Sequence, residues 1–260
     1  MDKRIILIET STALCSAALL EGDAVTAMRV SDTPRSHASM TAPFVKEILE
    51  ERGLRVQDCD AVCLSMGPGS YTGLRVGSST AKGLCFGAGI PLLAVGTLDV
   101  LAAQAIAEGL PDGCKYIVPM IDARRMEVYT AVYSAEGERL TEVAPVVVEN
   151  IVSIGLPSPA FQAEVPLAPG RKGQSRSANL THSTTEPEDN TGILFIGDGV
   201  AKCEQVLAGE GRYFRQECPR ADAMKAPALR EFAAGAFRDT AYFEPFYLKD
   251  FVATVGKRLF

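Results

Sequence analysis

Residues 65–77 read Ser-Met-Gly-Pro-Gly-Ser-Tyr-Thr-Gly-Leu-Arg-Val-Gly. A short apolar run at 61–64 precedes this stretch, and a helical pattern rich in small residues follows over 72–88. The glycines are therefore expected at a turn from a strand into a helix. Backbone N–H groups at such a turn can bind an anion or meet the backbone of another segment.

The turn can be interpreted in two ways. Gly67 and Gly69 permit positive φ angles, and Ser70 can cap the helix, as a phosphate-binding loop requires. No Lys-Ser/Thr pair follows the last glycine, however, and the spacing does not fit a dinucleotide-binding loop. The pattern favours a tight structural turn over a phosphate site.

Composition limits the class of protein. The chain has 260 residues, is 47% hydrophobic and carries a net charge of −6. An acidic chain without a basic stripe is a poor nucleic-acid binder on its own. The run at 5–8 is too short for a signal peptide, and no apolar stretch reaches the roughly 20 residues of a membrane span. We expect a soluble, cytoplasmic protein without membrane contact, whose seven cysteines are reduced and mostly buried.

The order of elements predicts the fold. Strand, hairpin, helix, strand and helix occur in the first half, and a diverged copy follows in the second. The first half has strands expected at 4–9, 15–20, 24–30, 61–64 and 92–95, and helices at 38–52, 72–88 and 98–107. The second half has strands at 116–121, 125–133, 140–148 and 193–196, and helices at 200–207 and 222–237.

This order predicts an α/β protein with two ribonuclease H-like domains and mixed sheets, the architecture of the actin, Hsp70 and sugar kinase superfamily. We expect one domain over 1–100 and a second over 101–260. A polar stretch at 157–192 lacks any period and is interpreted as an insertion in the second domain. The C-terminal helix, 222–238, is able to pack back on the first domain.

The histidines argue against metal or triad catalysis. The chain has only His37, which has no second histidine or carboxylate three or four positions away, and His182, which lies in the polar stretch at 157–192. No Gly-x-Ser-x-Gly motif is present. We therefore expect no catalytic residue, metal site or cofactor.

Two carboxylates follow the first strands of the two halves. Glu9 and Asp122 could mark a residual nucleotide cleft, or they could be solvated strand ends or acceptors that cap a neighbouring turn. Residues 10–12 supply no glycine to let a phosphate approach, so the second interpretation is favoured for Glu9. Asp122 is expected to pair with Arg124 and Arg125 at the surface.

The helices over 38–52 and 72–88 carry more apolar and small residues than one buried face needs. In the second, glycine or another small residue recurs every four positions, at Gly73, Gly77, Ala81 and Cys85. Glycine inside a helix costs about 1 kcal/mol against alanine, so these residues need a packing reason. Either the extra face is internal, or a helix pair of a partner chain covers it; the pattern leaves both open.

Four segments carry a resemblance. They are Ile6-Leu-Ile-Glu-Thr-Ser-Thr, Ser36-His37, Gly67-Pro-Gly-Ser-Tyr-Thr-Gly-Leu-Arg-Val-Gly, and Pro245-Phe-Tyr-Leu. The chain resembles the TsaB (YeaZ) family, accessory subunits of the bacterial tRNA threonylcarbamoyladenosine machinery. The likeness covers nearly the whole chain except the insertion, which looks longer than is usual in the family.

The resemblance implies two actin-like domains and a subunit that is not itself the transferase. It implies pairing with the catalytic paralogue TsaD through the two N-terminal helices, a small ATPase, TsaE, that joins them, and tRNA bound only within the complex. The same face would form a homodimer when the partner is absent. Matched to this sequence, the partner-binding candidates are Met40, Phe44, Leu74, Arg75, Val76 and Gly77. Structural loop residues, or possible nucleotide contacts, are Glu9, Ser11, Gly67, Gly69, Ser70 and Asp122.

Three functions are thus weighed. The first is a non-catalytic scaffold that activates the catalytic paralogue. The alternative is a weak ATP-binding phosphotransferase or ATPase that uses Glu9, Asp122 and the two glycine turns, the second at 197–199. A peptidase or chaperone-like module ranks last.

Overall fold

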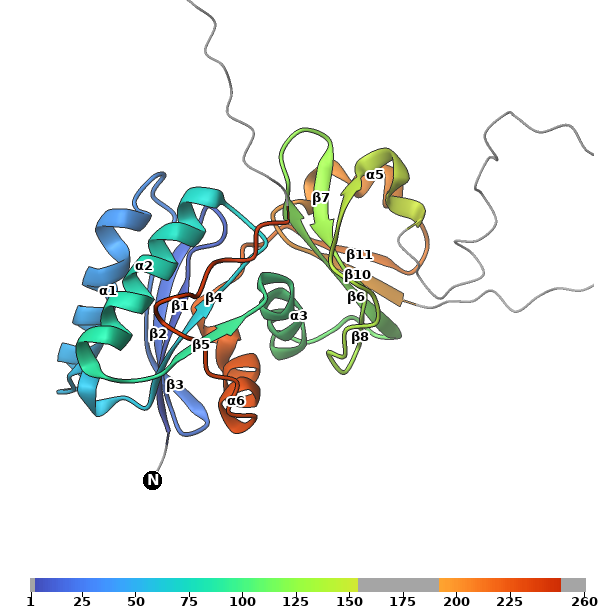
Figure 1. Cartoon of the computed structure of the whole chain (residues 1–260). Helices are drawn as coiled ribbons and strands as arrows, with labels where there is room; N and C mark the ends of the chain where they lie inside the picture. Colours follow the sequence, from blue (N-terminus) through green and yellow to red (C-terminus); the bar gives the residue numbers. More distant parts are fainter. Residues whose placement is uncertain (1–2, 154–191, 249–260) are drawn as a thin grey trace, which may run out of the picture.

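The computed structural model describes residues 3–153 and 192–248, which form two sheets with helices packed on them (Figure 1). The α/β fold with two mixed sheets agrees with the expectation from the sequence. The predicted insertion lies outside the described residues except for Gly192, which begins a strand.

The first sheet has the strand order β3-β2-β1-β4-β5. β1 pairs antiparallel with β2 and parallel with β4, and β4 pairs parallel with β5. Its strands are β1 (Arg4–Glu9), β2 (Cys15–Glu21), β3 (Ala24–Ser31), β4 (Ala61–Ser65) and β5 (Leu92–Val95). The helices of this half are α1 (His37–Glu51), the 3-10 turn η1 (Val56–Asp58) and α2 (Tyr71–Ala88).

Strand β1 is buried on both faces, as its unbroken apolar run predicts. Ile6 and Ile8 face the core shared with α1 and α2. Ile5 and Leu7 face the opposite core, which contains the C-terminal helix α6. The two N-terminal helices therefore cover one face of the first sheet, and α6 covers the other.

The second sheet has the order β11-β10-β6-β7-β9, and β8 also pairs with β6. Its strands are β6 (Cys114–Asp122), β7 (Glu127–Thr130), β8 (Tyr133–Ser134), β9 (Ala144–Val147), β10 (Gly192–Ile196) and β11 (Arg212–Arg215). Its helical segments are η2 (Val148–Ser153), η3 (Val200–Lys202) and α5 (Glu204–Leu207), followed by η4 (Ala221–Met224) and α6 (Lys225–Ala233), which pack on the first sheet.

Helix α3 (Thr97–Ala107) joins the halves. Val100 packs in the core of the first sheet, whereas Leu98 and Leu101 pack against the second. Buried Gln104 donates to the Glu217 carboxylate and to Cys218 O. The boundary predicted at residue 100 falls inside this helix, which lies between the two sheets in Figure 1.

Several predicted elements are shorter than expected. The strand predicted at 125–133 begins only at Glu127, because Arg124 and Arg125 form a turn with positive φ angles. The regular strand pairing is also interrupted at Val132, whose N–H donates to the Thr141 hydroxyl rather than to a backbone carbonyl. The strand predicted at 140–148 is shortened to Ala144–Val147. The helix predicted at 200–207 breaks into η3 and α5, and α6 ends before Gly235, which adopts a φ of 64°.

All seven cysteines are free, and five of them are buried, as predicted. Among the described residues, no helix combines the length and apolar character that crossing a bilayer requires.

Candidate functional site

The β4–α2 turn has the capping that the sequence predicts. Gly67 adopts a φ of 110°, and the Ser70 hydroxyl accepts a hydrogen bond from Gly73 N at 3.3 Å. Helix α2 then runs to Ala88 and ends at Gly89 with a φ of 68°. The segment is therefore a strand–turn–helix unit with a capped helix N-terminus.

Three glycines of this unit face the loop that follows β1. A methyl group on Gly69 would collide with Ser11 O, and one on Gly73 would collide with Thr10 O. A methyl group on Gly77 would meet the Thr10 hydroxyl. The small residues at the start of α2 thus have a packing reason inside the chain.

Hydrogen bonds close the same contact. Ser70 N donates to Ser11 O at 2.6 Å, and the Thr10 hydroxyl donates to Gly73 O at 2.9 Å. The Ser70 amide, which a phosphate loop would present to a ligand, is used by the protein itself. The structural interpretation of the turn therefore fits its geometry better than a phosphate cradle does.

Of the two structural roles expected for Glu9, the solvated strand end is wrong. Its side chain is fully buried, and its Oε1 accepts from Ser11 N at 2.6 Å, so the idea of an acceptor for the neighbouring turn is correct. Burial raises the pKa of the carboxyl to about 7, against the lowering effect of the hydrogen bond that Ser11 N donates. The sequence could not show that the end of β1 is covered by segments distant in the chain.

Three buried polar atoms near this point have no hydrogen-bond partner among the described residues. They are Glu9 Oε2, the Ser11 hydroxyl and the Thr12 hydroxyl. Ser11 and Thr12 line a cleft of about 1170 Å³ between the two halves. Both side chains are buried, so their hydroxyl oxygens lie beneath the wall of the cleft and are not open to solvent.

The cleft brings together loops from both halves. Of the sequence-predicted residues it contains Ser11, Gly69, Ser70, Val76 and Asp122, whereas Glu9 and Gly67 do not line it. Segments that sequence reasoning did not assign to a site also line it: the β3–α1 link with Arg35, the β6–β7 turn, and Phe246–Leu248.

Asp122 is exposed at the end of β6, but its ion pair is not the predicted one. Its Oδ1 accepts from Lys202 Nζ at 2.6 Å and from Arg124 N at 2.7 Å. Asp198 accepts from Asp122 N at 2.8 Å, and burial raises the pKa of the Asp198 carboxyl to about 6. The partner Lys202 lies 80 residues away in sequence, so local spacing could not identify it.

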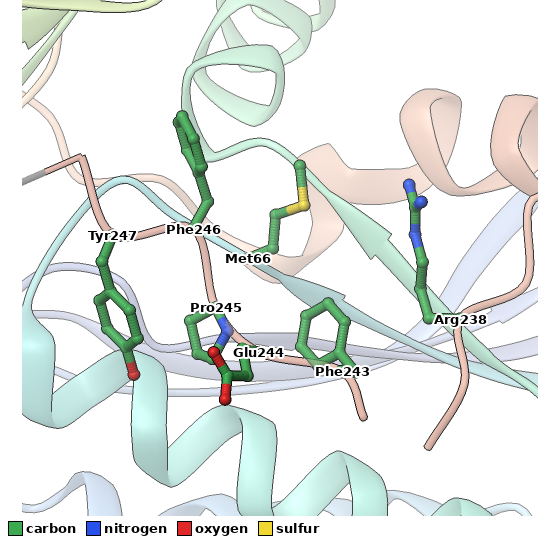
Figure 2. A pocket seen from close by; sticks show the side chains of 7 residues that line it. All are labelled: Met66, Arg238, Phe243, Glu244, Pro245, Phe246 and Tyr247. Atoms are coloured by element: carbon green, nitrogen blue, oxygen red, sulfur yellow. The ribbon is translucent and has the colours of Figure 1, made fainter. Parts of the chain in front are cut away.

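The C-terminal segment crosses the glycine turn (Figure 2). Phe246 N donates to Met66 O at 2.7 Å, and Lys82 Nζ donates to Ala241 O and Phe243 O at 3.2 and 3.1 Å. A pocket of about 500 Å³ lies between this segment and Met66. The Pro-Phe-Tyr-Leu motif was the signal for this segment, although its contact with the turn was not predicted.

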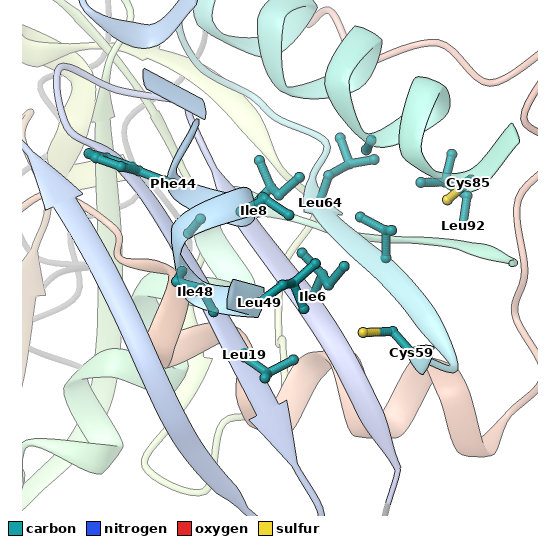
Figure 3. Close-up of a cluster of buried hydrophobic side chains, with 14 of the residues drawn as sticks. Ile6, Ile8, Leu19, Phe44, Ile48, Leu49, Cys59, Leu64, Cys85 and Leu92 are labelled. Carbon is teal, nitrogen blue, oxygen red and sulfur yellow. The ribbon is translucent and has the colours of Figure 1, made fainter. Parts of the chain in front are cut away.

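The partner-binding candidates divide by exposure. Phe44 is buried in the first core (Figure 3), where Met40 packs at the edge, and Leu74 and Gly77 are also buried. Arg75 is exposed and Val76 half-buried. The buried candidates can affect binding at the outer face of α1 and α2 only indirectly, by setting the position of these helices.

No cluster of three histidine, cysteine or carboxylate side chains suited to a metal ion occurs in 3–153 or 192–248.

The glycine packing predicts opposite effects for two substitutions in one helix. Gly73→Ala should destabilise the fold by about 1–3 kcal/mol, because the new methyl group meets the backbone of Thr10. Gly83→Ala should stabilise it by about 1 kcal/mol, since nothing lies within 4 Å of the added carbon. Urea unfolding of both variants measures the difference; equal midpoints would contradict the assigned contact.

Burial of Glu9 predicts a pH-dependent stability. The carboxyl ionises near 4.5 in the unfolded chain but near 7 in the folded one. Between those values the unfolded state loses its proton first, so the free energy of unfolding should fall as pH rises, by up to roughly 3 kcal/mol.

Glu9→Gln should remove this slope. The stability difference between the variant and the parent should shift in favour of the variant as pH rises from about 5 to about 8. Urea midpoints across this range give the comparison, in which the contribution of Asp198 is common to both proteins and cancels. A difference independent of pH would show that Glu9 is ionised in the fold.

Comparisons with known proteins agree with this architecture. A solved structure from Pseudomonas aeruginosa, described as an uncharacterized protein with similarity to peptidase YeaZ, superposes with a TM-score of 0.74 at 25% identity, over 95% of this chain and all of that one. YeaZ from the same organism gives 0.71 at 24% identity, which supports the shared fold.

Sequence relatives match about half of the chain. The tRNA threonylcarbamoyladenosine biosynthesis protein TsaB of Escherichia coli is 38% identical over 133 residues, 51% of this chain and 56% of that protein. TsaB of Bacillus subtilis is 36% identical over 142 residues, 54% and 59% respectively. The chain thus spans a little over half the length of these curated relatives.

A family model covers more of the chain. The model described as TsaD, tRNA N6-adenosine threonylcarbamoyltransferase, matches residues 31–255. With its α/β fold and its TsaB-named relatives, the chain belongs to the TsaD family and, within it, to the TsaB (YeaZ) group.

Proposed function

We propose that this chain is a non-catalytic subunit of the machinery that makes threonylcarbamoyladenosine in tRNA. In this proposal the outer face of α1 and α2 binds a TsaD-like catalytic paralogue, and a TsaE-like ATPase joins the pair. The complex works on tRNA in the cytoplasm. The relatives named for this biosynthesis support the general role, and the surface of α2 supports the mode of assembly.

The observation that carries the proposal is the second set of glycines in α2. Gly73 and Gly77 face inward against the β1–β2 loop, whereas Gly83 and Gly87 face open space. Each glycine in the interior of a helix lowers the stability of the helix by about 1 kcal/mol relative to alanine. Within the described chain, no neighbouring group lies so close to these two positions that it would require a glycine. A helix of another chain that approaches closely would supply one.

The neighbouring side chains favour an apolar contact at this place. Phe86 lies between the two open glycines and is 86% exposed. Exposed Arg75 and Ser79 continue the face toward the N-terminus of α2. Helix α1 lies beside α2 on the same side of the first sheet (Figure 1). Two helices with a small-residue stripe and one aromatic side chain suit docking by a similar helix pair.

The contacts of the glycine turn support a subunit without chemistry of its own. Phosphate binding at α2 would need free amides and an open approach, but Ser11 O occupies the Ser70 amide and Thr10 O packs on Gly73. Asp122 is engaged by Lys202 at 2.6 Å. In this proposal these groups hold segments together within each half rather than bind a reacting phosphate.

One observation favours the alternative of a weak ATP-binding enzyme: a cleft of about 1170 Å³ is lined by both the glycine turn and Asp122. Calorimetry of the chain with Mg-ATP distinguishes the two functions. Binding together with hydrolysis that Glu9→Ala abolishes would support the enzyme, and heat equal to dilution alone would support the scaffold.

The docking face predicts a loss of binding without a loss of folding. Gly83→Arg and Phe86→Glu should each weaken co-purification with the TsaD-like paralogue by at least about tenfold, since a bulky or charged group then enters the helix interface. Unfolding midpoints should stay near the parent value, because neither side chain is needed for the core.

Ala233→Arg provides the matched control, because Ala233 is exposed on α6, on the other side of the first sheet. It should leave binding unchanged. Wild-type binding by Gly83→Arg and Phe86→Glu would show that the paralogue docks elsewhere.

A further inference from the structure

We propose that the mouth of the cleft between the two halves binds the phosphates of tRNA in the assembled complex, through Arg35, Arg124 and Arg125. The inference rests on the proposed function and adds an RNA contact of this chain itself to it. It is carried by the charges, the backbone and the ring contacts found at this cleft.

The three arginines are the first observation. All are exposed and line the cleft, and none forms an ion pair with a carboxylate of the described residues. Many other arginines are paired, such as Arg29 with Glu51 at 2.6 Å and Arg220 with Glu108 at 2.6 Å. Guanidinium groups that are free at one place are available to bind phosphate oxygens in pairs.

The backbone is the second observation. Within the part of the chain that the structure describes, the non-glycine residues with positive φ are these same three arginines, at 62°, 64° and 52°. Such a conformation is unfavourable for a side chain with a β-carbon and is found mostly where a site requires it. Arg35 comes from the first half and Arg124 and Arg125 from the second, so one extended ligand would contact both.

The carboxylates at the cleft leave these charges available. Asp122 is engaged by Lys202, and Asp198 accepts from the backbone of Asp122. Asp32 and Glu127 complete the acidic groups of the lining. The lining therefore carries three arginines and four carboxylates, one of which is bonded to Lys202, in a chain whose net charge is −6. The cleft mouth is therefore less repulsive to RNA than the chain as a whole.

Aromatic side chains at the cleft add groups that can contact a nucleotide base. The rings of Tyr71 and Tyr247 lie 5.1 Å apart at the cleft, and the Arg75 guanidinium sits 4.1 Å from the centre of the Tyr71 ring. Such platforms stack unpaired bases in RNA-binding proteins.

The test compares tRNA binding by the complex of the full chain with its TsaD-like paralogue. In the triple variant Arg35→Gly, Arg124→Gly, Arg125→Gly, the glycines accept the left-handed backbone, so the urea midpoint should hold or rise. Affinity for a tRNA transcript should fall by about tenfold. The slope of log affinity against log salt concentration should decrease by about 2, because three phosphate contacts are lost.

Arg230→Ala is the control, since Arg230 is exposed on α6 and forms no ion pair with a carboxylate of the described residues; it should leave both values unchanged. Equal tRNA affinity and slope for the triple variant and the parent would overturn the proposal, and so would displacement of the tRNA by millimolar Mg-ATP. Failure of the parent chain to bind the paralogue counts against the proposed function instead. Filter binding of the chain alone at low salt then decides the RNA contact by the same comparison.

Discussion

The structure depends on the close contact between the start of α2 and the loop after β1. Gly69 and Gly73 bring the helix so near that backbone meets backbone at Ser11 and Thr10. Hydrogen bonds from Ser70 N to Ser11 O and from Thr10 to Gly73 O hold the two segments together. Any side chain on either glycine would push α2 away from the sheet, so this contact sets the position of the helix and of everything that packs on it.

The contact has consequences in two directions. On one side it covers the end of β1, so Glu9 becomes a buried carboxyl whose pKa is raised to about 7 by the loss of water. On the other side it fixes the N-terminal turns of α2, over which the C-terminal segment passes with a bond from Phe246 N to Met66 O. Three distant parts of the sequence thus meet at one turn.

The sequence predicts the regular elements well, because burial imposes a pattern on them. The apolar run of β1, the cap at Ser70 and the stop at Gly89 are all local signals, and the order of elements gave the two mixed sheets. Features set by long-range packing were missed. The pairing of Asp122 with Lys202 and the burial of Glu9 depend on segments far apart in the chain, and the positive φ of Arg35 has no signature in its residue type.

The glycines of α2 show why a pattern with a correct period can still leave its meaning open. A repeat of four identifies a helix face but not what covers it. The structure assigns Gly73 and Gly77 to the interior and leaves Gly83 and Gly87 uncovered. Sequences are locally consistent with their fold except where function demands otherwise. Two sets of residues in this chain depart from what its own packing requires: the open glycines near the C-terminal end of α2 and the arginines with positive φ at the cleft. Tyr71 and Arg75 lie in the first turns of α2, and Tyr71 lines the cleft. A partner bound along α2 and an RNA bound at the cleft would therefore be neighbours, both positioned by the helix that the glycine contact fixes.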